Sequence, residues 1–143
     1  MGMADEAREK QLEAQRVQDL DAARQAEADR ITREWEDAVA SCVDEFLRAA
    51  RELGTKPRRS RPWRKTWLVN VPVGTKNWTS EYDSGPSTQT VAVYSDGTWE
   101  LVRSYSPGTS GKLVIERQKY PVSVDRNDPP PFENIRRAFV AVL

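Results

Sequence analysis

The chain has 143 residues, of which 38% are hydrophobic and 31% are charged, and its 22 basic and 22 acidic side chains give a formal net charge of zero. It is long enough to bury a core, it has no run of about 18 apolar residues that would indicate a membrane span, and its first 30 residues lack the apolar segment of a secretory signal. With no histidine and one cysteine, the composition excludes histidine-dependent catalysis and the common zinc and iron centres, so we expect no metal and no cofactor.

Charge is distributed unevenly along the chain. Residues 1–53 have 14 acidic and 8 basic side chains, which gives −6, whereas residues 54–66 have six basic and no acidic side chains, which gives +6. The remaining 77 residues carry eight charges of each sign. The pattern predicts an acidic segment (1–53), a basic linker (54–65) and a neutral body (66–143).

The first segment is predicted to be one long helix over residues 4–53. It is rich in Ala, Glu, Arg and Gln and contains no glycine or proline, a composition with high helix propensity. Gly54 stands where a left-handed cap would end the helix, and Pro57 follows it.

The two halves of this helix have different patterns. Residues 31–53 carry a broad apolar stripe at steps of three and four, which must pack on something; it comprises Ile31, Trp35, Ala38, Val39, Cys42, Val43, Phe46, Leu47, Ala49, Ala50 and Leu53. Residues 4–30, which we call the arm, have only Leu12, Val17 and Leu20 as large apolar side chains. An isolated helix of this kind is marginally stable, so the arm either projects and frays or pairs with a second copy or a partner.

The rest of the chain is predicted to form a small antiparallel sheet of four to five strands. Alternating apolar residues and turn-forming sequences place the strands at residues 66–73, 78–82, 90–94, 99–103 and 112–120. A break at Asp128-Pro129-Pro130-Pro131 is followed by a short C-terminal helix with Phe132, Ile135, Phe139 and Val142 on its apolar face. The fold class is therefore α+β, with a long N-terminal helix that covers one face of the sheet.

The strongest local signal is a hairpin around Asp96-Gly97. Asp-Gly is typical of a two-residue turn, since both positions need positive φ. A two-residue turn would pair Ser95 with Thr98 and set Tyr94 opposite Trp99.

No group of residues specifies a catalytic centre. The acidic pairs Glu81 with Asp83 and Asp96 with Glu100 lie in or beside predicted turns, where solvated carboxylates are common. Cys42 has apolar neighbours at helical spacing and is expected to be a small buried side chain. We therefore expect a protein that is not an enzyme.

Two surfaces suggest binding. The arm, with Leu12, Val17 and Leu20, and two tryptophans at the edges of elements, Trp63 and Trp78, are typical of protein contacts. The basic strip of residues 56–67 combines cations with Trp63 and Trp67, a composition typical of phosphate binding and base stacking; its cations are Lys56, Arg58, Arg59, Arg61, Arg64 and Lys65. The alternative is that this strip lies against the acidic helix.

The preferred hypothesis is a cytoplasmic interaction or assembly protein whose arm binds a protein partner or another copy of the chain, with no membrane association. Nucleic-acid binding through the basic strip is the second hypothesis. Arginine outnumbers lysine 16 to 6, a bias that weakly favours a bacterial or phage accessory protein.

Overall fold

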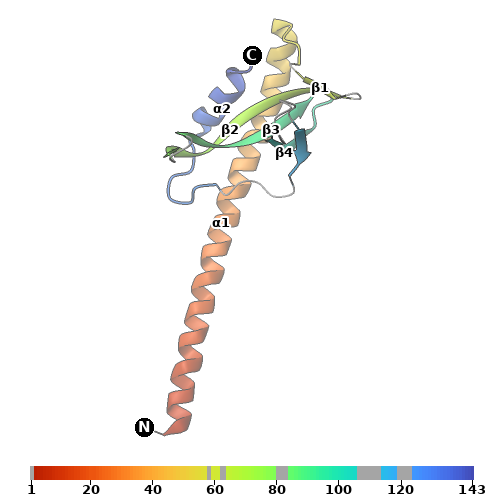
Figure 1. The fold of residues 1–143 in the computed structure, drawn as a ribbon. Coiled ribbons are helices and arrows are strands. Elements are labelled where there is room, and N and C mark those ends of the chain that lie inside the picture. Colours follow the sequence, from red (N-terminus) through yellow and green to blue (C-terminus); the bar gives the residue numbers. More distant parts are fainter. Residues whose placement is uncertain (1, 58, 62–63, 80–83, 106–113, 119–123) are drawn as a thin grey trace.

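A computed structural model of the chain describes residues 2–57, 59–61, 64–79, 84–105, 114–118 and 124–143, without the side chains of residues 59–61, 64, 76–79, 84–86 and 104–105. In chain order its elements are α1 (Met3–Leu53), β1 (Arg59–Arg61), β2 (Arg64–Thr79), β3 (Ser84–Tyr94), β4 (Trp99–Tyr105), β5 (Val114–Arg117) and α2 (Phe132–Val140). This order confirms the predicted α+β class. Figure 1 shows that only the C-terminal half of α1 lies beside the strands, while its N-terminal half extends away from them.

Helix α1 ends where the sequence predicts. Gly54 has a φ of 65°, in the left-handed region that glycine occupies without a steric penalty. The backbone N–H of Gly54 donates to the carbonyl of Arg51, and that of Thr55 donates to the carbonyl of Ala50, which satisfies carbonyls at the helix end. Leu53 was predicted to belong to the buried stripe, but it is 67% exposed because the last turn extends past the strands (Figure 1).

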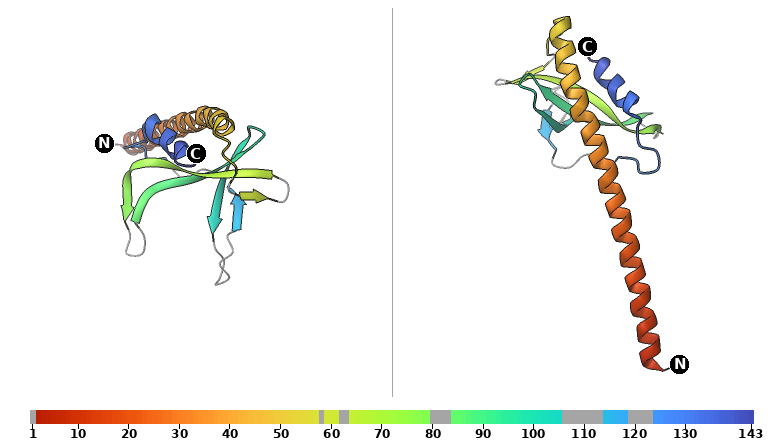
Figure 2. Two further views of the ribbon diagram at one scale, coloured as in Figure 1. Left: turned by 90° about the horizontal axis from the view of Figure 1, so that it is seen from above. Right: turned by 180° about the vertical axis from the view of Figure 1, so that it is seen from behind.

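The five strands form an antiparallel meander in the order β1-β2-β3-β4-β5. Both helices lie on one side of this sheet, and the sheet curves away from them towards its ends (Figure 2). One face of the sheet is therefore covered by helices, and the opposite face is turned away from them.

Strand β1 lies inside the segment that we predicted to be a linker, residues 54–65. Arg59 pairs with Thr66 and Arg61 pairs with Arg64, so the sheet begins with a hairpin of basic residues. The glycine, two prolines and six cations of this segment had favoured an irregular linker. The arginine-rich part is extended because it pairs with the start of β2.

Strand β2 is longer than predicted. We expected a strand at residues 66–73 and a turn at 74–77, but β2 continues to Thr79, with an irregularity in its pairing between Pro72 and Asn77. Pairing with β3 on both sides of this irregularity keeps the chain extended where the glycine indicated a turn.

The predicted hairpin between β3 and β4 is present, with a different turn. Val93, and not Tyr94, stands opposite Trp99, and the loop contains the three residues 95–97. The N–H of Gly97 donates to the carbonyl of Tyr94, and Gly97 has a φ of 94°, as in a three-residue loop whose last residue is left-handed. The shift by one residue moves Tyr94 to the face opposite Trp99.

The core lies between the helices and the covered face of the sheet. The apolar stripe of α1 packs there on alternate residues of β2 and β3 and on α2; the buried members are Ile31, Trp35, Val39, Cys42, Val43, Phe46, Leu47, Ala50, Trp67, Val69, Val71, Val73, Val91, Val93, Val124, Ile135 and Phe139. The ring of Phe46 packs edge-on against the rings of Trp67 and Phe139, with centroid distances of 5.6 Å and 5.9 Å. One α1 side chain therefore joins the sheet to α2.

Helix α2 buries Ile135 and Phe139 as predicted, whereas Phe132 remains 47% exposed. On its outer side the Arg136 guanidinium donates to both carboxylate oxygens of Glu45 on α1, with the shortest N···O distance 2.6 Å. This hydrogen bond, first, and the positive charge of Arg136 hold the pKa of Glu45 below its usual value.

Candidate functional site

The arm is a surface of the described chain that packs on nothing else in the same molecule. Residues 2–27 are all exposed, and the first buried residue of α1 is Ile31. The large apolar side chains predicted for partner binding are indeed on the surface, with Leu12 59%, Val17 55% and Leu20 53% exposed. About 28 residues of helix correspond to roughly 42 Å, and over this length tertiary packing within the chain contributes nothing.

Besides the backbone hydrogen bonds of the helix, the arm has described side-chain contacts between residues one turn apart. Gln15 donates to Asp19 at 2.9 Å, and Gln25 donates to Asp29 at 2.9 Å. Arg30 bridges two acidic side chains, Glu27 at 2.5 Å and Glu34 at 2.6 Å, and its hydrogen bond to Glu27 is the main cause of the lowered pKa of that carboxyl. Exposed pairs of this kind stabilise a helix only slightly.

An apolar hollow of about 250 Å³ lies where the arm joins the body. Helix α1 contributes Ile31, Glu34, Trp35 and Ala38 to its lining, and the other side is formed by Val124, Pro129, Pro130, Phe132 and Ile135. The half-exposed ring of Phe132 belongs to this lining. The arm and the hollow therefore form a continuous surface along α1.

A second surface is the sheet face turned away from the helices. Ala92, Tyr94 and Val102 are buried there in a small apolar cluster with Leu68 and Ile115. Beside this cluster the side chains of three residues meet, and their arrangement depends on the register of β4.

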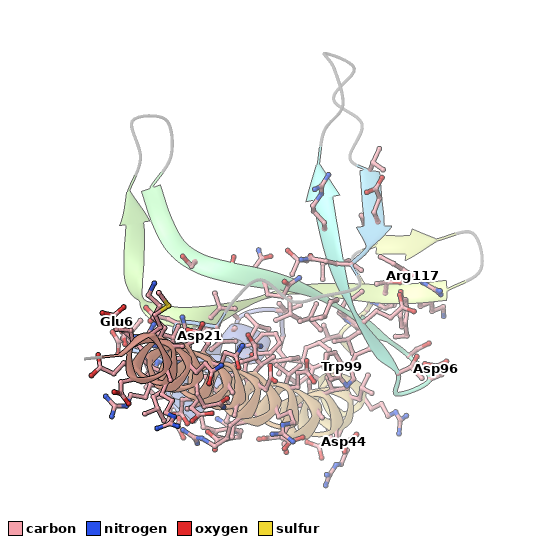
Figure 3. The ribbon with its side chains drawn as sticks, turned by 90° about the horizontal axis from the view of Figure 1, so that it is seen from below. Glu6, Asp21, Asp44, Asp96, Trp99 and Arg117 are labelled. Carbon is pink, nitrogen blue, oxygen red and sulfur yellow. The ribbon has the colours of Figure 1, made fainter. Side chains whose placement is uncertain are left out.

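Glu100 is the centre of that group. Its Oε2 accepts a hydrogen bond from the Tyr94 hydroxyl at 3.1 Å and another from Arg117 Nε at 3.1 Å. Figure 3 shows Arg117 beside the end of the sheet where β1 lies. This group was not predicted, because the predicted turn put Tyr94 opposite Trp99, which would have turned Glu100 towards the core.

The basic strip is divided among several elements. Lys56 is exposed ahead of β1, and Lys65 is exposed on β2. Arg59 and Arg61 belong to β1, and Arg64 begins β2.

Two predicted site residues, Arg58 and Trp63, lie outside the described residues. Trp78 pairs with Gly85 near the other end of β2, far along the strand from β1.

The register of the first hairpin aligns the arginine positions. Arg59 stands opposite Thr66 and Arg61 opposite Arg64, and strand alternation puts these backbone positions in the same series as Leu68. Leu68 belongs to the cluster on the face turned away from the helices. The arginine positions of the strip are thus aligned on the face opposite α1, and not on the face that α1 covers.

Trp67 does not contribute to a base-stacking surface. It is 6% exposed and lies in the core against Phe46. Its indole Nε1 is buried and has no hydrogen-bond partner among the described residues.

The residues that were considered for catalysis, where the structure describes them, are hydrogen-bonded within the fold or buried in it. Asp96 Oδ1 accepts hydrogen bonds from the N–H and the hydroxyl of Thr98 in the hairpin turn, and Glu100 is bound by Tyr94 and Arg117. Glu81 and Asp83 lie outside the described residues. Cys42 is buried, and burial, the largest effect, raises the pKa of its thiol, which disfavours the nucleophilic thiolate.

Comparison of the chain with protein-family profiles, with curated proteins and with solved structures finds no match. Among the residues that the structure describes, no group of three or more acidic or cysteine side chains is placed to hold a metal ion. Within the same residues, none of the helices combines the length and the apolar character needed to cross a membrane.

Proposed function

We propose that this protein is a non-enzymatic interaction or assembly module that uses the arm of α1 to bind a second copy of itself or a protein partner. The observation that carries the proposal is the contrast within α1. Between Ile31 and Ala50 its apolar stripe packs against the sheet and α2, whereas Val17 and Leu20 of the arm are more than half exposed.

The energetic argument concerns the arm. A helix without tertiary packing is marginal in water, because most helical stability in proteins comes from packing an apolar face. A second helix that covers Val17 and Leu20 would supply that packing, so the arm is a surface that gains stability by association.

Deletion of residues 4–28 tests the proposal by light scattering. We expect the particle mass to fall, or a bound protein partner to be lost, while the circular dichroism of the sheet is unchanged, because the core begins at Ile31. A deletion variant with the same particle mass and the same partners as the full chain would refute this function. As a control, Arg8→Ala with Arg16→Ala changes the charge of the arm without removing its length.

Nucleic-acid binding is the second candidate, favoured by the alignment of Arg59, Arg61 and Arg64 in the first hairpin. Arginine binds phosphate oxygens in bidentate geometry, and Arg117, which is exposed, also lies on the face opposite α1. Because that face is turned away from the acidic helix, neutralisation by α1 of the same chain is disfavoured.

Binding to single-stranded DNA at low salt tests this candidate. Affinity should fall steeply as salt rises, and it should be lost when Arg59, Arg61 and Arg64 are replaced by alanine. Replacing three exposed arginines elsewhere, Arg51, Arg126 and Arg137, is the control with the same change in net charge. Equal losses in both variants would indicate non-specific attraction, and no retention of the unmodified chain on DNA would refute the candidate.

A further inference from the structure

One stripe of the arm has a strict alternation of three- and four-residue steps. It consists of Glu6, Lys10, Glu13, Val17, Leu20, Arg24, Glu27 and Ile31, which we call the seam. This spacing keeps its members on one side of a helix, in the a and d positions of a heptad pattern. The seam ends at Ile31, where the buried stripe of α1 begins.

We propose that two copies of this chain bind through their seams as an antiparallel two-stranded coiled coil, in which Val17 of each copy packs against Leu20 of the other. The inference rests on the proposed function of the arm and names its partner as a second copy. Two apolar layers then form the centre of the contact, since the two-fold axis repeats each pair.

The charges next to this centre are complementary in the same register. Only the outermost seam pair is not, since it sets Glu6 opposite Ile31, which is already buried in its own chain. With Val17 opposite Leu20, Glu13 lies opposite Arg24 of the second copy, and the next layer sets Lys10 opposite Glu27. Each of these pairs occurs twice, so four opposite-charge layers flank the two apolar ones. The long side chains keep their charged ends in water and their aliphatic stems on the seam.

Other arrangements of the same seam are unfavourable. A parallel pair in register would set Lys10, Glu13 and Arg24 each against its own copy, and like charges in facing positions are destabilising. An antiparallel pair shifted by one heptad would set Leu20 opposite Lys10 or opposite Arg24. The sequence of charges therefore specifies both the orientation and the register.

The hollow at the base of the arm lies at the end of this contact. In the same register Met3 of the second copy, which is 90% exposed, falls opposite Glu34, and Glu34 lines the hollow with Ile31 and Phe132. The N-terminal turn of one arm would thus end at the apolar hollow of the other copy, where it covers the exposed Phe132 ring. The overlap from residue 3 to residue 34 is roughly 48 Å long.

The outer side of the arm stays free in this arrangement. The Gln15–Asp19 and Gln25–Asp29 hydrogen bonds join positions away from the seam, so pairing would not break them. Leu12 lies about 110° round the helix from the middle of the seam, and it is not part of the contact.

Charge reversal tests the register. Glu13→Arg alone and Arg24→Glu alone each convert two attractive layers into repulsive ones, and we expect each to weaken dimerisation by a factor on the order of ten or more. The double variant Glu13→Arg with Arg24→Glu should restore the dimerisation constant to within about threefold, because each reversed residue meets a reversed partner. In a parallel dimer the two changes would leave like charges facing each other as before, so each alone would have little effect.

Disulfide formation between different variants tests the orientation. In a Cys42→Ala background, Glu13→Cys and Arg24→Cys chains that are mixed and oxidised should form a covalent heterodimer, while each variant alone should remain uncrosslinked. Residue 13 of one copy lies roughly 16 Å along the axis from residue 13 of the other in the proposed register, beyond the reach of a disulfide. Crosslinking of Glu13→Cys with itself would overturn the antiparallel arrangement.

The outcomes separate this inference from the proposed function. A full chain that is monomeric at every concentration would overturn pairing between copies, and the arm could then serve only a different protein partner. A dimer that depends on the arm but fails both the charge-reversal and the disulfide tests would overturn the seam and leave the proposed function intact. A dimer that persists without the arm would overturn both.

Discussion

The indole Nε1 of Trp35 donates a hydrogen bond to the carbonyl oxygen of Pro72 at 2.9 Å. Trp35 is a helix residue and Pro72 lies in the middle of β2, so this bond joins α1 to the sheet close to the point where the arm leaves the body. Trp67 presents the opposite case in the same core, since its Nε1 is buried without a described partner.

These two tryptophans should respond differently to the same substitution. Trp35→Phe removes a donor and leaves the Pro72 carbonyl with one partner fewer, and we expect a loss of about 2 kcal/mol in the free energy of unfolding. Trp67→Phe removes a buried donor that is unsatisfied in the described structure, so the lost packing is partly offset and the cost should be below about 1 kcal/mol. Urea denaturation of both variants measures the difference; equal losses would contradict this account of the two indoles.

The contact between Glu45 and Arg136 should make stability depend on pH. The pKa of Glu45 is lowered in the folded state from 4.5, so its stabilising effect is fully present above that value and is lost as the pH falls through the folded pKa. We expect the wild-type chain to have a higher melting temperature than Glu45→Gln at about pH 7, and the two to converge at acidic pH. A melting-temperature difference that does not change with pH would refute the ionic contribution.

Gly97 should be sensitive to substitution for a backbone reason alone. Its φ is 94°, and among the described residues no heavy atom other than those of Gly97 and its chain neighbours lies within 4 Å of the position that a Cβ would take. Gly97→Ala should therefore cost about 1 kcal/mol through conformational strain. Gly97→Asn is the matched control and should cost less, because asparagine tolerates positive φ better. Thermal denaturation that ranks Ala as the milder change would contradict the observed turn.

The helicity of the arm should depend on protein concentration. Helical signal in far-ultraviolet circular dichroism should increase with concentration as arms pair, because an unpaired arm is marginally stable. Val17→Glu should weaken that dependence, since it puts charge into the central apolar layer. Leu12→Glu is the control, with the same change in charge on an equally exposed side chain outside the seam. Equal effects of the two substitutions would count against the seam.

The sequence was sufficient to predict features that depend on local chemistry. A composition without glycine or proline, followed by Gly54, determines the extent of α1, and the apolar stripe from Ile31 determines which half is buried. Asp96-Gly97 indicated a hairpin, because few other dipeptides tolerate positive φ. The Phe132–Phe139 pattern predicted α2 in the same way.

Features that depend on pairing between distant residues were not predictable to the same degree. The loop at residues 95–97 has one residue more than the predicted turn, and this shift decides that Tyr94 meets Glu100. Strand β1 forms only because the start of β2 is available to pair with it. The apolar residues alone do not reveal the seam, because most of its members are charged. Its regularity appears only when the signs of the charges are compared between two helices.

The most direct measurement is the mass of the full chain in solution by sedimentation equilibrium. We expect a particle mass that rises with concentration and reaches twice the chain mass of 16.3 kDa. After removal of residues 4–28 we expect one chain mass at all concentrations. A full chain that stays at one chain mass up to its solubility limit, or an armless chain that still doubles, would contradict the claim that the arm pairs copies of this protein.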